Sequence, residues 1–397
     1  MIKFSNFLTE ASTTSSEEKL THLEHAEDHP INAGAAGFQH AKKTLMGVHK
    51  ALQGEKSNVS LTTKYDGSPS IVFGHHPETG KFFVASKSAF NKDPKINYNQ
   101  ADIEKNHGHA PGLVAKLSAA LKHLPKVTPK AGVYQGDIMH SGGSSGDVKM
   151  HGGEAHFTPN TITYSTKKKG EAEQAAKSKI GVAIHTAYTG PSFDKLKANY
   201  NAGHQGFGEH KDVHLMDVTH ETAKSKYTPT NAVMFQQHMD KAEEAHKELE
   251  KSGGYKTIEP HTDHLKTYIN KTVRTGATPS VEGYKAHVTE IHQKLADKVS
   301  TPAKKTEKIN AGKQLTDHID ANKQHFQKMF DLHHHLQQAK DQLVHGLSSH
   351  TSYAHTIGNK ASKPEGFVAV VNNRPTKLVH RTGEDSFSAA NFAKNAK

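Results

Sequence analysis

The stretch "TTKYDGSPSIVFG", Thr62 to Gly74, places one lysine directly before a tyrosine, an acid and a glycine, between two short runs of β-prone residues. β-branched and aromatic residues on both sides of a turn signal predict two strands joined by a tight connection at Asp66 and Gly67. Lys64 is then either a solvated charge at a strand end or a side chain that the turn directs at a ligand. The rest of the chain favours the second interpretation.

Composition limits the classes of protein that fit. The chain has 397 residues, 34% of them hydrophobic, enough for two domains or for one domain with a large insertion. No apolar run reaches the roughly 18 residues that a membrane span needs, so we expect no membrane association. The absence of cysteine excludes disulfides, thiolate nucleophiles and cysteine-bound zinc. A net charge of +11, with 33 histidines besides, favours a polyanionic partner such as nucleic acid.

The hydrophobic pattern predicts an α+β fold with mostly antiparallel strands. A helical pattern precedes the opening stretch, and a second one, carrying Leu113, Leu117 and Leu121, follows it. Short runs with strand character surround these helices. The main ones are residues 59–65, 70–74, 81–85, 132–139, 160–165, 180–187 and 212–218.

Near Thr228 the pattern changes to amphipathic helices, and strand character returns only at "EGFVAVVNN" and "TKLVHR". A continuous long helix is expected through Leu315, Ile319, Phe326 and Leu347. We therefore predict a strand-bearing core that a large all-α insertion interrupts. The expected division is an N-terminal targeting or flexible segment at 1–30, the first part of the core at 31–227, the insertion at 228–360 and the end of the core at 361–397.

Several motifs occur in an informative order along the chain. Lys64 begins a K-x-D-G motif, and "ASKS" ends the strand-like run at 81–85. Further along the chain, "VYQGDIM" carries Asp137. Glu365 then begins an E-G-x-V motif, and Lys377 follows it. This order resembles the covalent nucleotidyltransferase superfamily, which comprises DNA ligases, RNA ligases and capping enzymes. The resemblance covers roughly residues 30–220 and 360–397 and is nearest to RNA ligases. It implies an ATP-grasp-like fold of antiparallel β-sheets with helices.

The resemblance also implies roles for individual residues. Lys64 would be the catalytic nucleophile that attacks ATP and forms a lysyl-AMP, to be used for joining 5′-phosphate and 3′-hydroxyl ends of RNA or DNA. A nucleophilic amine must be unprotonated, so we expect cationic neighbours, a divalent metal or partial burial to lower the pKa of Lys64. Asp137 and Glu365 would bind Mg²⁺. The residues implied in nucleotide binding are Tyr65, Asp66, Gly67, Ser86, Lys87, Asp137 and Lys377.

Two positions depart from the family pattern. Pro69 stands where DNA ligases and capping enzymes carry arginine, and Val379 stands where a second lysine is usual after Lys377. Little sequence follows Lys377, so we expect no C-terminal OB-fold, and the basic faces of the insertion become candidates for nucleic-acid contacts. The alternative is a non-enzymatic virion or nucleic-acid-binding protein on a degenerate ligase scaffold.

The first residues, "MIKFSNFLTEA", resemble the capsid-targeting sequences of internal proteins of large tailed phages. In such proteins a prohead protease cuts after a Leu/Ile-x-Glu tripeptide. Leu8, Thr9 and Glu10 fit that pattern and would leave Ala11 as the new terminus. The resemblance implies a location in the phage virion interior or the host cytoplasm.

Overall fold

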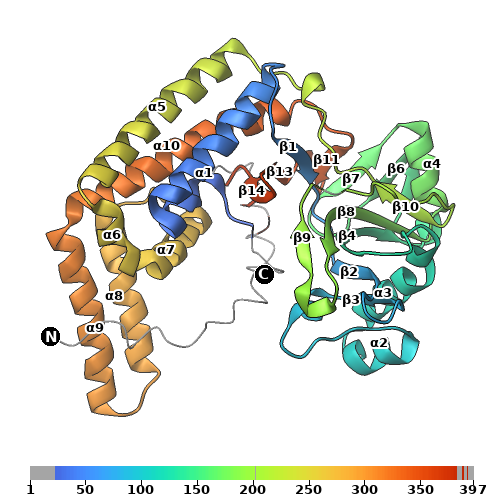
Figure 1. Ribbon diagram of the computed structural model, residues 1–397, viewed down its shortest axis with the longest axis horizontal. Coiled ribbons are helices and arrows are strands. Elements are labelled where there is room, and N and C mark those ends of the chain that lie inside the picture. The colour runs from blue at the N-terminus through green and yellow to red at the C-terminus, as the bar shows by residue number, and fades with distance from the viewer. Residues whose placement is uncertain (1–22, 202, 382–386, 389–390, 392–397) are drawn as a thin grey trace.

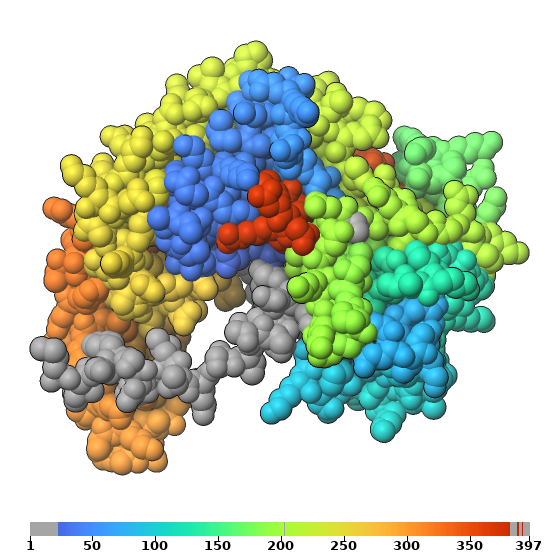
Figure 2. Space-filling view, viewed as in Figure 1, coloured from blue at the N-terminus to red at the C-terminus, as the bar shows by residue number. Residues whose placement is uncertain are grey.

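The computed structural model describes residues 23–201, 203–381, 387–388 and 391. It confirms a mixed α+β architecture, with the longer helices on one side of the molecule and most strands, together with α2, α3 and α4, on the other (Figure 1). The expected cleavage site at Leu8 to Glu10 lies outside the described residues. Strands β13 and β14 lie between the two sides (Figures 1 and 2).

The central sheet contains six strands in the order β10-β8-β4-β2-β3, with β9 paired to β8. All pairs are antiparallel except β10 and β8, which are parallel. The strands are β2 (Ser70–His75), β3 (Phe82–Ala85), β4 (Val133–Ser141), β8 (Ile180–Thr189), β9 (Lys197–Asn199) and β10 (Val213–Met216).

The two faces of this sheet have different coverings. Helices α2 (Gln100–His107) and α3 (Pro111–His123) cover one face, packing on Ile71, Phe73 and Ile138. Helix α4 (Lys169–Lys177) and a second sheet cover part of the other face. That second sheet has the order β12-β11-β7-β6-β5. Its strands are β5 (Lys149–His151), β6 (Glu154–Phe157), β7 (Thr163–Thr166), β11 (Ala354–Ile357) and β12 (Lys360–Ala361).

A small third sheet joins the two sides of the molecule. Strand β1 (Ser60–Lys64) pairs antiparallel with β13 (Gly366–Val371), which pairs antiparallel with β14 (Arg374–Leu378). Residues separated by about three quarters of the chain therefore become neighbours. The pairing of β1 with β13 therefore brings the end of the chain beside Lys64.

A run of six helices begins at α5, where Thr228 caps the helix by accepting a hydrogen bond from the Asn231 amide at 3.1 Å and Pro229 occupies the first turn. The expected long helix is instead two helices, because Asn322 leaves helical geometry between α9 and α10. The helices are α5 (Pro229–Lys251), α6 (Gly254–Ile258), α7 (Thr262–Thr275), α8 (Val281–Asp297), α9 (Pro302–Ala321) and α10 (Lys323–Leu347).

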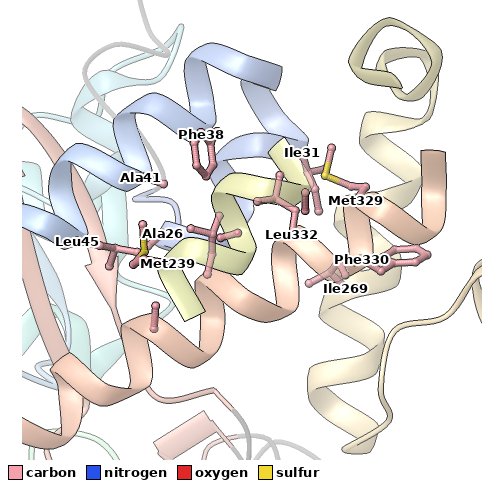
Figure 3. Close-up of a cluster of buried hydrophobic side chains, with 14 of the residues drawn as sticks. Ala26, Ile31, Phe38, Ala41, Leu45, Met239, Ile269, Met329, Phe330 and Leu332 are labelled. Atoms are coloured by element: carbon pink, nitrogen blue, oxygen red, sulfur yellow. The ribbon is translucent and has the colours of Figure 1, made fainter. Parts of the chain in front are cut away.

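The largest core shows that the expected segment boundaries need correction. Helix α1 (His29–Leu52), assigned to the strand-bearing core, packs its Phe38, Ala41 and Leu45 face against α5 and α10 (Figure 3). Ala26, from the segment expected to be flexible, is buried in the same cluster. A helical face is apolar wherever it is buried, so its pattern does not identify the partner it packs against. Strand β11 likewise lies within the range expected to be helical and pairs with β7.

Candidate functional site

Lys64 is the last residue of β1, and its backbone lies opposite Gly366 of β13. This register places Glu365, the residue before Gly366, beside the lysine. The Lys64 ammonium donates a hydrogen bond to Glu365 Oε1. Their side chains are 27% and 11% exposed, so the ion pair is mostly shielded from water. The two motifs that the sequence placed at opposite ends of the chain therefore meet at one point.

Asp66 fixes the turn that follows Lys64. Its carboxylate accepts hydrogen bonds from the Asn160 side chain at 2.8 Å and from the backbone amides of Thr161 at 2.7 Å and Ile162 at 3.0 Å. Its own amide donates to the Tyr164 hydroxyl at 2.6 Å. Because the carboxylate is occupied by these donors, Asp66 attaches the turn to the second sheet and so sets the direction of β1.

Gly67 is required by a close approach of the turn to β4. A Cβ atom at this position would lie 2.4 Å from the Asp137 Cβ and 2.9 Å from the Met139 sulfur. Cβ atoms essentially never approach non-bonded atoms this closely, so a side chain here would displace β4. Gly67 thereby allows the Lys64 turn to lie directly over Asp137.

Replacing Gly67 by alanine is therefore expected to destabilise the protein by about 1–3 kcal/mol, the usual cost of overpacking a tight site, and to displace Asp137. Thermal or denaturant unfolding measures the loss. Gly112→Ala is the matched control, because Gly112 lies in α3 with open space where a Cβ would be added. A Gly67→Ala variant as stable as Gly112→Ala would contradict this packing.

Lys64 lies where two adjoining hollows meet. Both hollows are also lined by Tyr65, Ser70, Lys87 and Asp137. The deeper hollow is a cavity of about 290 Å³ on the sheet face opposite α2 and α3. Alternation along β4 directs Gln135 and Asp137 to this face. The shallower hollow is lined by Lys64, Tyr65, Asp66, Gly67, Ser70, Ser86, Lys87, Asp137 and Glu365.

The remaining expected residues take different places around these hollows. Tyr65 is buried, and its hydroxyl donates to the Asp217 carbonyl at 3.0 Å. Ser86 caps the short 3-10 helix Lys87–Phe90 by accepting from the Ser88 amide at 3.3 Å, so its hydroxyl is partly used by the backbone. Lys87 lines both hollows and forms no ion pair within the described residues. Its ammonium is available to an anion.

Lys377 on β14 forms part of the wall of the deeper hollow. Burial and the neighbouring Lys64 ammonium lower its pKa to about 8. No carboxylate in the described part of the chain forms an ion pair with it. Two lysines, Lys87 and Lys377, thus present amines without a carboxylate partner to the space beside Lys64.

The Lys64 pKa differs from the sequence-based expectation. Burial opposes the charged form, but the Glu365 carboxylate outweighs this and raises the pKa of Lys64 above its ordinary value. Burial also raises the pKa of Glu365, and Asp66 and Asp137 add to the effect, while Lys64 opposes it. The expected lowering of the Lys64 pKa is therefore wrong for the protein without ligands, in which the amine is held protonated by Glu365.

The two expected metal ligands have oxygens suited to a hard cation. Glu365 Oε2 is buried and has no hydrogen-bond partner among the described residues, although Oε1 binds Lys64. The Asp137 side chain is 21% exposed, and its partial burial opposes ionisation, but His185 and Lys64 still lower its pKa. In the described residues no group of three or more His, Cys, Asp or Glu side chains forms a complete metal site. Two carboxylates together with phosphate oxygens fit Mg²⁺, which keeps several waters.

His185 is a site residue that the sequence did not indicate. Gln135 pairs with Thr186 and Gly136 with Ile184, so His185 is the extra residue of a β-bulge on β8. Its Nε2 lies 3.8 Å from Asp137 Oδ2. Bulges redirect single side chains and follow from strand register, which no local pattern reveals. Other unforeseen residues lining the deeper hollow are Thr62, Gln135, Thr186, Tyr188 and Tyr200.

Comparison with known proteins places the chain in a family without giving it an activity. Residues 20–397 match a family described as a family of unknown function, DUF6267. The chain belongs to the DUF6267 family. No curated protein and no solved structure is similar enough to count as a match. Among the described residues, the helices are all too short or too polar to cross a membrane.

Proposed function

We propose that this DUF6267 protein is an ATP-dependent nucleotidyltransferase of the RNA-ligase-like kind, which forms a lysyl-AMP at Lys64 and joins 5′-phosphate and 3′-hydroxyl ends of a polynucleotide. One observation carries the proposal. The Lys64 amine lies where two hollows meet, next to Glu365 and surrounded by Lys87, Lys377 and Asp137. A nucleophilic amine, phosphate-binding amines and metal-binding carboxylates are what a covalent adenylylation needs in one place.

In the proposed first step the Lys64 nitrogen attacks the α-phosphorus of ATP. A nitrogen–phosphorus bond forms, the bond from the α-phosphorus to the bridging oxygen breaks, and pyrophosphate leaves. The amine must give up its extra proton before it attacks, and Glu365 Oε1 already accepts a hydrogen bond from it. Burial, which raises the pKa of Glu365, makes this carboxylate a better proton acceptor than an exposed one.

The surrounding residues would stabilise the charge that develops on the phosphates. Lys87 and Lys377 would bind phosphate oxygens, since neither is used in an ion pair within the described residues. Asp137 and Glu365 would hold Mg²⁺, which supplies Lewis-acid stabilisation of the phosphoryl oxygens when bound. In the second step the AMP passes to a 5′-phosphate, and in the third a 3′-hydroxyl attacks and releases AMP.

Intact-mass spectrometry tests this function. The protein is first treated with pyrophosphate and desalted to remove any adenylate already attached, then incubated with Mg²⁺ and ATP or, separately, GTP. We expect a gain of one adenylate with ATP and its removal when pyrophosphate is added back. No gain with either nucleotide would refute the proposal, and a guanylate gain alone would reassign the nucleotide.

The alternative is a non-enzymatic nucleic-acid-binding protein on a degenerate ligase scaffold. Its supporting observation is that Val379, at the position of the usual second lysine, is a buried apolar side chain that is only 5% exposed. This alternative predicts salt-sensitive binding to DNA or RNA that Lys64→Ala leaves unchanged, together with no adduct. Electrophoretic shifts at two salt concentrations, run beside the mass measurement, distinguish the two functions.

We also propose that the protein is packaged inside a phage capsid after a prohead protease removes its first residues. The support is the "MIKFSNFLTEA" sequence alone. Peptide mass spectrometry of purified virions should find a chain beginning at Ala11. A virion-derived chain that begins at Met1 would contradict the cleavage.

A further inference from the structure

A cluster of buried charges joins three distant parts of the chain near the site. Glu27, just before α1, and Lys340, in the middle of α10, are both 0% exposed, and the lysine donates to Glu27 Oε1 at 2.7 Å. Arg381, after β14, donates to Asp28 Oδ1 at 3.0 Å and Oδ2 at 2.9 Å and lies 3.4 Å from Glu27 Oε1. His333 of α10 completes the cluster at 3.0 Å from Asp28 Oδ1.

A cluster of buried charges contributes little net stability to a fold. Moving charges out of water costs several kcal/mol per ion, and well-packed apolar residues in the same place are often as stable or more so. The surrounding core of α1, α5 and α10 is mainly apolar, and its other buried polar side chains, among them His49, His246 and Gln337, are not carboxylates or lysines. The charges therefore call for an explanation other than stability, and the known use of buried polar groups is to fix one particular arrangement.

The arrangement fixed here includes Lys377. Residues between Leu23 and Asp28 run beside β14, where the Lys377 amide donates to the Glu24 carbonyl at 2.8 Å and His25 forms a parallel bridge with Lys377. Leu23 lines the same hollow as Lys377. The cluster is therefore close in sequence to both partners of this pairing. Glu27 lies two residues beyond His25, and Arg381 lies four residues beyond Lys377.

We propose that Glu27, Arg381 and Lys340 form a clamp through which helix α10 of the insertion holds the Lys377 strand, and so sets the position of the Lys377 amine at the wall of the hollow. These three are positioning residues, because none of them lines either hollow. The insertion is then part of the site's construction rather than only a separate binding module. Any effect of the clamp on adenylylation rests on the proposed function, whereas its effect on the position of Lys377 does not.

The clamp has an observable consequence in the acid–base behaviour of Lys377. Burial lowers the pKa of its amine, and Lys64 and Arg381 lower it further, while Glu365 and Asp28 raise it. If the clamp is released, β14 loosens and water reaches the amine, so the pKa returns towards that of an ordinary lysine. The pKa of Lys377 therefore reports the position of the strand without any nucleotide.

The test uses the double variant Glu27→Leu, Lys340→Met in the full chain, which removes one charge of each sign and leaves Arg381 paired with Asp28. Lysines are acetylated briefly over a range of pH, and Lys377 is quantified by peptide mass spectrometry. We expect the pH at which Lys377 acetylation is half-maximal, its midpoint, to rise by about one pH unit or more from the wild-type value. The matched control is Lys271→Met, Glu290→Leu, which removes an exposed ion pair of 2.6 Å between α7 and α8 and should leave the midpoint unchanged.

An unchanged Lys377 midpoint in the folded double variant would overturn the clamp. Hydrogen exchange of the wild-type protein gives a second test that needs no variant. The Lys377 amide should exchange as slowly as the buried amides of α10, and markedly faster exchange would also overturn the clamp. Adenylylation is measured separately. A shifted midpoint in a protein that never forms an adduct would support the clamp and refute the proposed function.

Discussion

Lys64→Arg is expected to abolish adenylate attachment while leaving the fold intact. Arginine keeps a positive charge beside Glu365, so the carboxylate is not left buried without a partner. A guanidinium does not lose its proton in proteins, so it cannot attack phosphorus. We expect adduct formation to fall by about 10³-fold or more, because the nucleophile itself is lost. The rate of mass gain with ATP and Mg²⁺ measures this.

Two comparisons make the Lys64 result specific. Lys64→Ala should also lose the adduct, and in addition should lose about 1–3 kcal/mol of stability because Glu365 is left unpaired. Lys42→Arg is the control, since Lys42 forms a similar ion pair with Glu243 at 2.7 Å far from the site. Adduct formation by Lys64→Arg at the rate of the Lys42→Arg control would exclude Lys64 as the nucleophile.

Glu365→Gln is expected to slow adduct formation by about 10²-fold or more while ATP binding persists. The amide oxygen can still accept a hydrogen bond from Lys64, so the side chain keeps its place. The amide can neither take the amine's proton nor contribute negative charge to a metal site. The rate is measured by quenching the reaction at saturating ATP after different times and determining the adenylylated fraction by intact-mass spectrometry.

The Glu365 variant also tests the electrostatics of the protein without ligands. Since the Glu365 charge raises the pKa of Lys64, its removal should lower that pKa and make the amine more reactive at a given pH. Timed acetylation of Lys64 across pH gives this shift. Glu243→Gln is the control, and equal Lys64 reactivity in the two variants would contradict the assigned role of Glu365.

The sequence predicted most of the architecture because the strong local signals agree with the structure. The turn at Asp66 and Gly67 joins β1 and β2 as expected, and the change of pattern near Thr228 coincides with the start of α5. The resemblance to nucleotidyltransferases implied that Lys64 and Glu365 act in one site, and the register of β1 with β13 places them side by side.

What the sequence could not predict depends on contacts between distant segments. The apolar face of α1 fits a helical partner as well as a sheet, and only packing assigns it to α5 and α10. Glu27 and Asp28 resemble an ordinary acidic pair at a helix start, and their burial against Lys340 and Arg381 has no local signal. The protonated state of Lys64 follows from its contact with the Glu365 carboxylate, which spacing along the chain does not report.

The most direct test of the account is to locate the adenylate within the chain. The protein is incubated with ATP and Mg²⁺, digested at neutral or alkaline pH to preserve an acid-labile nitrogen–phosphorus bond, and sequenced by tandem mass spectrometry. The account predicts one adenylate, on Lys64, in the peptide that contains Tyr65 and Asp66. A modification on Lys87 or Lys377 in its place, or no modified peptide at all, would contradict it.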